Sequence, residues 1–123
     1  MPTIKEIVWL AGLLEGEGSF TWGRAYSKPR PNGPKYEYYR AKIVLGMSDL
    51  DVMERAATIL GVSVCESKRV KLKPHYKTMY HLECQGKRAI GWMQTLYSLM
   101  GSRRQAKIRE VVLAYKTTGK VRA

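Results

Sequence analysis

Cysteine is scarce in this chain, and its scarcity excludes two classes of small protein. Of the 123 residues, only Cys65 and Cys84 are cysteines, and neither is part of a Cys-x-x-Cys pair. Two such residues are too few for a disulfide framework or a zinc knuckle. His81 precedes Cys84 by an odd separation, which in a strand places the two side chains on opposite faces. Both cysteines are therefore expected to be reduced and structural.

Long hydrophobic runs are also lacking. No stretch reaches the length that a transmembrane helix needs, and residues 1–6 lack the basic start of a signal peptide. We therefore expect no membrane partner. The expected location is intracellular, either the cytoplasm of a bacterium or phage host or an organelle.

Acidic residues are few beside basic ones. The 10 Asp and Glu residues against 22 Lys and Arg leave a formal net charge of +12. A surplus of this size on a small domain favours a polyanionic partner such as nucleic acid. The alternative is a protein that is merely basic, but the basic residues cluster. With 45% hydrophobic residues, we expect one folded domain over residues 1–115 and a basic tail over 116–123.

The spacing of apolar residues predicts an α-β-β-α-β-β-α-α order. Helical spacing between capping residues and glycines occurs over residues 3–16, 48–60, 87–99 and 102–115. Alternation of apolar and polar residues occurs over residues 19–26, 36–47, 62–71 and 75–85. The predicted class is α+β, with one four-stranded antiparallel sheet and the helices on one of its faces.

The sheet face that the helices leave open is expected to be polar and basic. Strand parity places on it Thr21, Arg40, Lys42, Lys68, Lys77 and His81. A two-stranded ribbon fits the major groove of DNA, so these residues are candidate DNA contacts. Lys28 and Arg30 are further candidates from a Pro-rich hairpin loop. The alternative is a solvated face, as on any half-exposed strand, and a one-residue slip would invert the assignment.

The run Leu10-Ala11-Gly12-Leu13-Leu14-Glu15-Gly16-Glu17-Gly18 is the most specific feature of the sequence. Gly12 and Gly16 are four residues apart, so they stack on one helix face. Each glycine inside a helix costs roughly 1 kcal/mol relative to alanine, a cost that close approach to another backbone explains. The residues expected to pack against a partner helix are Leu10, Ala11, Gly12, Leu13 and Gly16.

Glu17 is expected just past the end of this helix. Two such helices packed side by side in parallel would bring two Glu17 carboxylates together, where like charges repel. A divalent cation relieves that repulsion, and Mg²⁺ prefers carboxylate, water and phosphate oxygens. Metal ions held in this way support phosphodiester hydrolysis. The alternative is an ordinary helix end with acidic residues nearby.

The run resembles the LAGLIDADG motif of homing endonucleases, with Leu-Leu-Glu-Gly-Glu-Gly standing for Leu-Ile-Asp-Ala-Asp-Gly. Ser19-Phe20, Met47-Ser48-Asp49 and the basic segment at residues 101–105 are also similar to segments of that family. The predicted element order matches the αββαββα fold of the family, and the resemblance covers residues 4–115. The motif departs from the family pattern by having Glu where Asp is commoner at both acidic positions.

The resemblance implies a homing endonuclease that makes a double-strand cut in a long, near-palindromic DNA site, of the kind linked to intron or intein mobility. A single motif implies a homodimer with Mg²⁺ as cofactor, and Mn²⁺ or Ca²⁺ as a substitute for binding. The implied metal ligand is Glu17, with Gly16 beside it, and Glu15 is expected to be structural. Some family members place a lysine shortly before the final helix, where this chain has Ser102. Arg103 and Arg104 are therefore the candidate catalytic residues near the scissile phosphate, or plain contacts to the DNA backbone.

Two other functions stay open at this point. Some proteins of this fold bind DNA without cutting it or assist the splicing of intron RNA, although an acidic residue at position 17 favours cutting. A small basic RNA- or ribosome-associated protein is the other alternative, and it would be a monomer without metal dependence. Trp9, Trp22 and Trp92 are expected to belong to the core and not to stack on single strands.

Overall fold

The structure is a computed structural model that describes residues 2–26, 37–67 and 78–118. Its elements follow the predicted order. They are α1 (Ile4–Glu17), β1 (Gly18–Tyr26), β2 (Glu37–Met47), α2 (Leu50–Leu60), β3 (Cys65–Glu66), β4 (Tyr80–Gln85), α3 (Gly86–Leu96), the 3-10 turn η2 (Tyr97–Leu99) and α4 (Ser102–Thr118).

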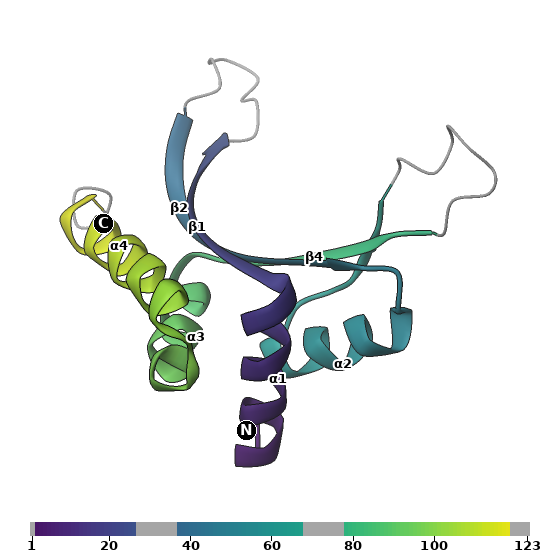
Figure 1. Cartoon of the computed structure of the whole chain (residues 1–123). Helices are drawn as coiled ribbons and strands as arrows, with labels where there is room; N and C mark the ends of the chain where they lie inside the picture. Colours follow the sequence, from purple (N-terminus) through teal and green to yellow (C-terminus); the bar gives the residue numbers. More distant parts are fainter. Residues whose placement is uncertain (1, 27–36, 68–77, 119–123) are drawn as a thin grey trace, which may run out of the picture.

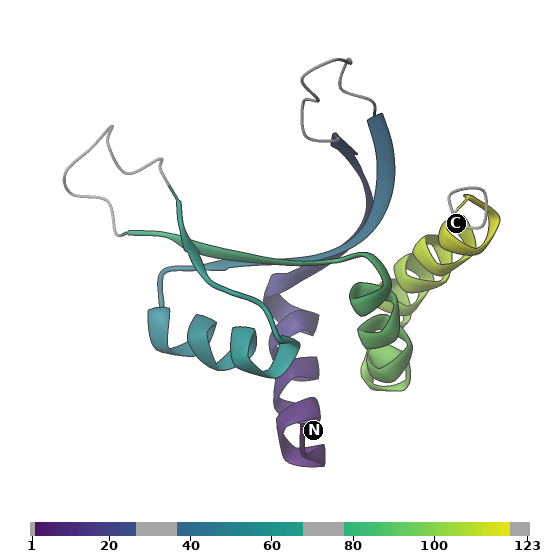
Figure 2. The ribbon, with the colours of Figure 1, turned by 180° about the vertical axis from the view of Figure 1, so that it is seen from behind.

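The strands form one four-stranded antiparallel sheet in the order β1-β2-β4-β3. Figures 1 and 2 show that the sheet curves and that all the helices lie on its convex side. The predicted α+β class, with helices on one sheet face, is therefore confirmed. The concave face carries no helix from the described parts of the chain.

The core lies between the sheet and the helices. Phe20, Ile43 and Leu82 point inward from three adjacent strands and are fully buried with Leu10 and Leu14 of α1. Burying one such side chain contributes about 1.5–3 kcal/mol, so this layer holds α1 against the sheet. The three tryptophans are partly buried and pack against the same core, which agrees with the sequence prediction.

The start of α1 is built as the sequence predicts. Thr3 caps the helix: its Oγ1 accepts a hydrogen bond from the backbone N–H of Glu6 at 3.1 Å. The Glu6 carboxylate accepts one from the Thr3 N–H at 2.8 Å. These bonds to Thr3 lower the pKa of Glu6, because they stabilise its charged form. The capping box fixes where the motif helix begins.

Several element boundaries differ from the predictions. α1 runs through Glu17, which is therefore the last helical residue and not the first one beyond the helix. β3 begins at Cys65, because the N–H groups of Gly61 and the next residue both bond to the Ala57 carbonyl and prolong the end of α2. α4 continues past residue 115 to Thr118.

Gly18 is required by a close approach at the α1–β1 junction. A Cβ atom there would lie 2.5 Å from Leu14 Cδ2 and 3.0 Å from Leu14 Cα. We expect Gly18→Ala to destabilise the protein by about 1–3 kcal/mol, the usual cost of overpacking, measured by urea denaturation. Gly46→Ala in β2 is the matched control, since its Cβ would meet only the Tyr80 carbonyl at 3.6 Å. Equal stability of the two variants would contradict the packing described.

Candidate functional site

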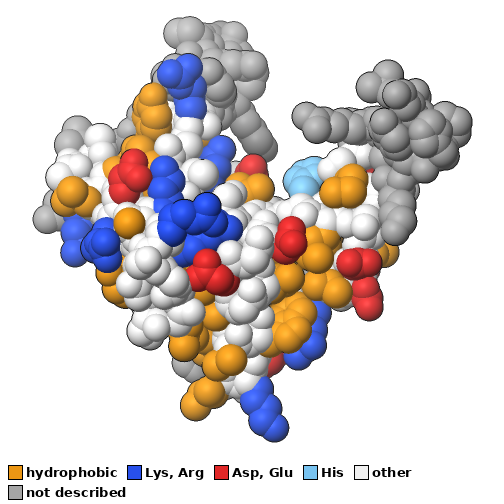
Figure 3. All heavy atoms as spheres, viewed as in Figure 1, with side chains coloured by type: hydrophobic (Ala, Val, Ile, Leu, Met, Phe, Trp, Pro, Cys, Tyr) orange, Lys and Arg blue, Asp and Glu red, His pale blue; other side chains and the backbone are white. Residues whose placement is uncertain are grey.

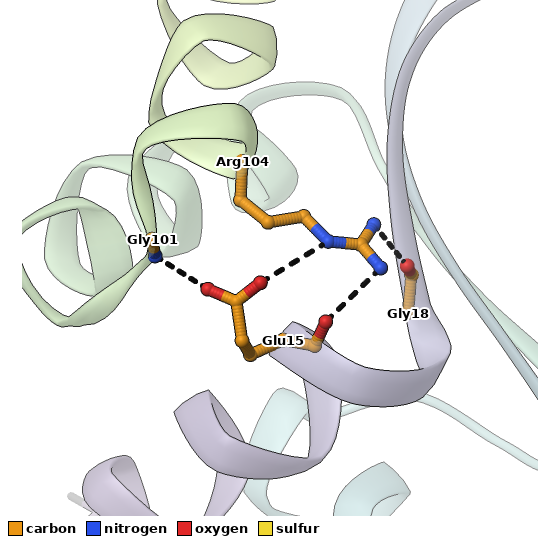
Figure 4. Close-up of polar contacts among 4 residues, drawn as sticks. All are labelled: Glu15, Gly18, Gly101 and Arg104. Carbon is orange, nitrogen blue, oxygen red and sulfur yellow. Dashed lines mark hydrogen bonds and ion pairs between the residues drawn. The ribbon is translucent and has the colours of Figure 1, made fainter.

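The α1–β1 junction carries the two acidic residues of the motif, and it places them differently. Glu17 is exposed, whereas Glu15 faces the start of α4. One Glu15 carboxylate oxygen accepts a hydrogen bond from the backbone N–H of Gly101, and the other lies 3.6 Å from Nε of Arg104 (Figure 4). The prediction of a structural role for Glu15 agrees with these contacts.

Arg104 is turned toward the junction and away from solvent. Its side chain is 16% exposed, and its guanidinium donates to the carbonyls of Glu15, at 3.1 Å, and of Gly18 (Figure 4). The last carbonyls of a helix have no helical partner, and the negative end of the helix favours a cation. The Arg104 nitrogens therefore face Glu15 and Gly18 within the chain, and its place near the scissile phosphate stays a prediction.

Glu17 offers a single exposed carboxylate at the C-terminal end of α1, next to the exposed Gly16. Among the described residues, no group of three or more His, Cys, Asp or Glu side chains could hold a metal ion. Mg²⁺ commonly takes one or two protein carboxylates and completes its shell with water and phosphate oxygens. Glu17 fits one chain's share of such a site, with further oxygen ligands supplied from outside the chain.

The two faces of α1 differ in their exposure to solvent. Leu10 and Ala11 are 0% and 3% exposed in the chain's own core, which corrects their predicted contact with a partner helix. Gly12 and Gly16 are exposed, and nothing lies within 4 Å of a Cβ built at either position. Nothing in the described parts of the chain therefore requires glycine at these positions. Leu13 is partly buried at the border between the two faces.

The strand parity predicted for the open sheet face is confirmed. Thr21 pairs with Lys42 in the β1–β2 register, and Arg40 follows on the same face of β2. His81 of β4 pairs with Cys65 of β3 and lies 3.1 Å, Nδ1 to Oγ, from Ser67. The side chains on the opposite parity, such as Ile43, are buried. The remaining predicted DNA contacts lie outside the described residues: Lys28, Arg30, Lys68 and Lys77.

A row of hydrogen bonds on the open face was missed from the sequence. Arg40 Nη1 donates to Oε1 of Gln85 at 3.0 Å, and Gln85 Nε2 donates to Oε2 of Glu83 at 2.5 Å. Lys42 Nζ donates to the carbonyl of Arg24 at 3.2 Å. The signal was available, since Glu83 and Gln85 share the strand parity of the predicted contact in β4.

A shallow groove between β1 and α4 joins the junction to the open face. It is lined by residues that include Ser19, Thr21, Arg103, Lys107 and Glu110, of which Lys107 and Glu110 form an ion pair at 3.3 Å. Arg103 is exposed, unlike its neighbour Arg104. Figure 3 shows Lys and Arg side chains gathered over α4 and the β1–β2 half of the molecule. The groove is therefore suited to an anionic backbone, with Arg103 as its exposed guanidinium.

No model of a known protein family and no curated protein matches the chain. Solved structures do match. The group I intron-encoded homing endonuclease I-CeuI, complexed with DNA, has a TM-score of 0.69 and 11% identity, covering 98% of this chain and 58% of that one. The homing endonuclease I-CvuI, in complex with the uncleaved I-CreI target in the presence of Mg, has a TM-score of 0.65 and 15% identity, covering 91% of this chain and 66% of that one.

A third solved structure carries the family name. The LAGLIDADG homing endonuclease I-LtrWI, bound to target DNA, has a TM-score of 0.57 and 16% identity, covering 94% of this chain and 39% of that one. The fold of this chain is that of the LAGLIDADG homing endonucleases, and the chain spans 58%, 66% and 39% of the three solved chains named above. In the described residues, no helix is long and apolar enough to cross a membrane.

Proposed function

We propose that this chain is a site-specific double-strand DNA endonuclease that acts as a homodimer with a divalent metal ion. The observation that carries the proposal is the exposed Glu17 carboxylate at the end of α1. On this helix Gly12 and Gly16 are covered by no described part of the chain. The fold is shared with solved homing endonucleases that are bound to DNA.

The partner in the dimer is a second copy of α1. Gly12 and Gly16 leave room for a backbone to approach, and Val8, 53% exposed, lies one turn earlier on the same face. Two copies of α1 packed in parallel through this face would bring the two Glu17 carboxylates toward one another, because Glu17 is the last residue of each helix. Leu13 borders the contact.

Glu17 from each copy would hold Mg²⁺, with Gly16 beside it, and Mn²⁺ or Ca²⁺ would substitute for binding. When bound, the metal supplies activation of water and stabilisation of the leaving oxygen. The Glu17 carboxylate would hold the metal at the C-terminal end of α1, where the helix dipole also favours a cation. Arg103 would contact the DNA backbone near the cut.

The open sheet face would read the DNA. We propose Thr21, Arg40, Lys42 and His81 as contacts in the major groove. The predicted contacts at residues 28, 30, 68 and 77 remain part of the proposal, although they lie outside the described residues. With a net charge of +12, the chain would bind DNA with a marked dependence on salt.

The catalytic role of Glu17 is tested with Glu17→Gln on a randomised DNA library in Mg²⁺. We expect the wild-type protein to cleave one near-palindromic site, and the variant to lose more than about 100-fold in cleavage while binding survives, because the amide is a poor metal ligand. Glu54→Gln, an exposed carboxylate of α2, is the matched control and should cleave normally.

Specific binding by the wild-type protein without cleavage in any divalent metal would contradict the proposal. It would favour the alternative, a non-cleaving DNA-binding or intron RNA splicing protein of the same fold.

The dimer is tested with Gly12→Ala and Gly16→Ala. Alanine should stabilise the isolated chain by up to about 1 kcal/mol, because it is the better helix former, yet it should weaken self-association more than about tenfold by overpacking the contact. Gly91→Ala in α3 is the matched control, since Gly91 is also exposed, with nothing within 4 Å of its Cβ position.

Sedimentation equilibrium measures the association, and urea denaturation measures the stability. If Gly12→Ala and Gly91→Ala associate as tightly as the wild-type protein, the proposed dimer contact is wrong.

A further inference from the structure

We propose that Arg104 is a positioning residue for Glu17: it fixes the backbone on both sides of Gly16 and Glu17 and so determines where the Glu17 carboxylate stands. This inference rests on the proposed function, because it concerns the same metal ligand. It gives Arg104 a role through another residue, and not through contact with metal or DNA.

The first observation is the bracketing of Glu17 by the Arg104 guanidinium. Nη2 donates to the Glu15 carbonyl at 3.1 Å and Nη1 donates to the Gly18 carbonyl, so the two bonds enclose the peptide units of Gly16 and Glu17 (Figure 4). Both carbonyls lie where α1 turns into β1. One planar side chain therefore holds the last turn of the helix and the first residue of the strand in a fixed relation.

The second observation is that a contact with the Glu15 carboxylate holds the Arg104 side chain in place. Its Nε has no hydrogen-bond partner but lies 3.6 Å from Oε2 of Glu15, a weaker but charge-paired contact. The other Glu15 oxygen accepts the backbone N–H of Gly101, just before α4. A Cβ at position 101 would lie 3.1 Å from that oxygen, so glycine permits this approach. The start of α4 and the end of α1 are thus tied together through Glu15 and Arg104.

A fixed backbone matters more for glutamate than for aspartate. Glu17 has one more rotatable bond than the aspartate commoner at this position, so its carboxylate covers a wider volume for the same backbone. Metal and catalytic groups work within about 0.5 Å of their productive geometry. The hydrogen bonds to the Glu15 and Gly18 carbonyls restrict the backbone torsions around Glu17. Only the side-chain torsions of Glu17 are then left to adjust when a metal binds.

Arg104→Lys is the most informative variant. It keeps the positive charge near the helix end but cannot hold two carbonyls in one plane. Arg109→Lys is the matched control, because Arg109 lies on the same helix and donates to the Tyr97 hydroxyl away from the junction. Gly101→Ala is a second variant, which displaces the Glu15 carboxylate from the other end and needs no change at Arg104.

The measurement is Mn²⁺ binding and Mn²⁺-dependent cleavage, with the protein bound to its library-selected DNA target. For Arg104→Lys we expect Mn²⁺ affinity to fall about 10–100-fold. The Mn²⁺ concentration for half-maximal cleavage should rise by the same factor, the KM for DNA should stay unchanged, and excess Mn²⁺ should restore the rate. Gly101→Ala should shift the metal dependence in the same direction, and Arg109→Lys should not.

The outcomes separate this inference from the proposed function. If Arg104→Lys lowers stability or the active fraction but leaves the Mn²⁺ dependence at the wild-type value, Arg104 is structural only and the inference is overturned. If the wild-type complex shows no Mn²⁺ binding that depends on Glu17, the proposed function fails and this inference fails with it. That second result is read from the wild-type protein and Glu17→Gln alone, before any Arg104 variant is compared.

Discussion

The abrupt change from helix to strand at the end of α1 is the constraint on which the rest of the structure depends. The chain leaves the helix at Glu17 and enters an edge strand at Gly18 with no intervening loop. This is sterically feasible because Gly18 lies against Leu14. It is electrostatically feasible because Arg104 donates to the carbonyl of Glu15 at the helix end, which has no partner within the helix, and to the carbonyl of Gly18 at the strand start. The two acidic residues consequently occupy different surroundings, Glu15 inside the junction and Glu17 outside it.

The same separation of faces runs through the whole molecule. One side of α1 and one side of the sheet form the core, as the burial of Leu10 and Ile43 shows. The other side of α1 presents glycines, and the other side of the sheet presents Arg40 and Lys42. A small basic chain can in this way keep a complete core and still leave two faces uncovered by the described parts of the chain, and these are the faces on which the proposed dimer and DNA contacts lie.

The features that the sequence predicted well are those that depend on residues close together in the chain. The capping box, the alternation in β1, β2 and β4, and the glycine cap of α2, with φ at 77° on Gly61, are all set by neighbours along the chain. These features were enough for the α+β fold and for the polar face of the sheet. Glu17 was placed correctly at the helix end, to within one residue.

Contacts between distant residues explain what the sequence predicted poorly. Arg104 and Glu15 are 89 positions apart, and only the packing of α4 against the junction shows that the guanidinium is engaged there. The nine-residue motif likewise does not reveal which of its side chains face inward. Leu10 and Ala11 belong to the core because α2, η2 and the sheet all pack against α1, a fact that helical spacing alone does not contain.

The central claim is that two copies meet through the glycine face of α1 with their Glu17 residues side by side. Its most direct test is oxidative cross-linking of Gly12→Cys in a Cys65→Ser background, which removes the exposed native thiol. Helices that pack through this face bring the new cysteines within the roughly 7 Å between Cα atoms that a disulfide allows. We predict rapid formation of a covalent dimer that still binds DNA. Cross-linking no faster than for Gly91→Cys on α3 would contradict the claim.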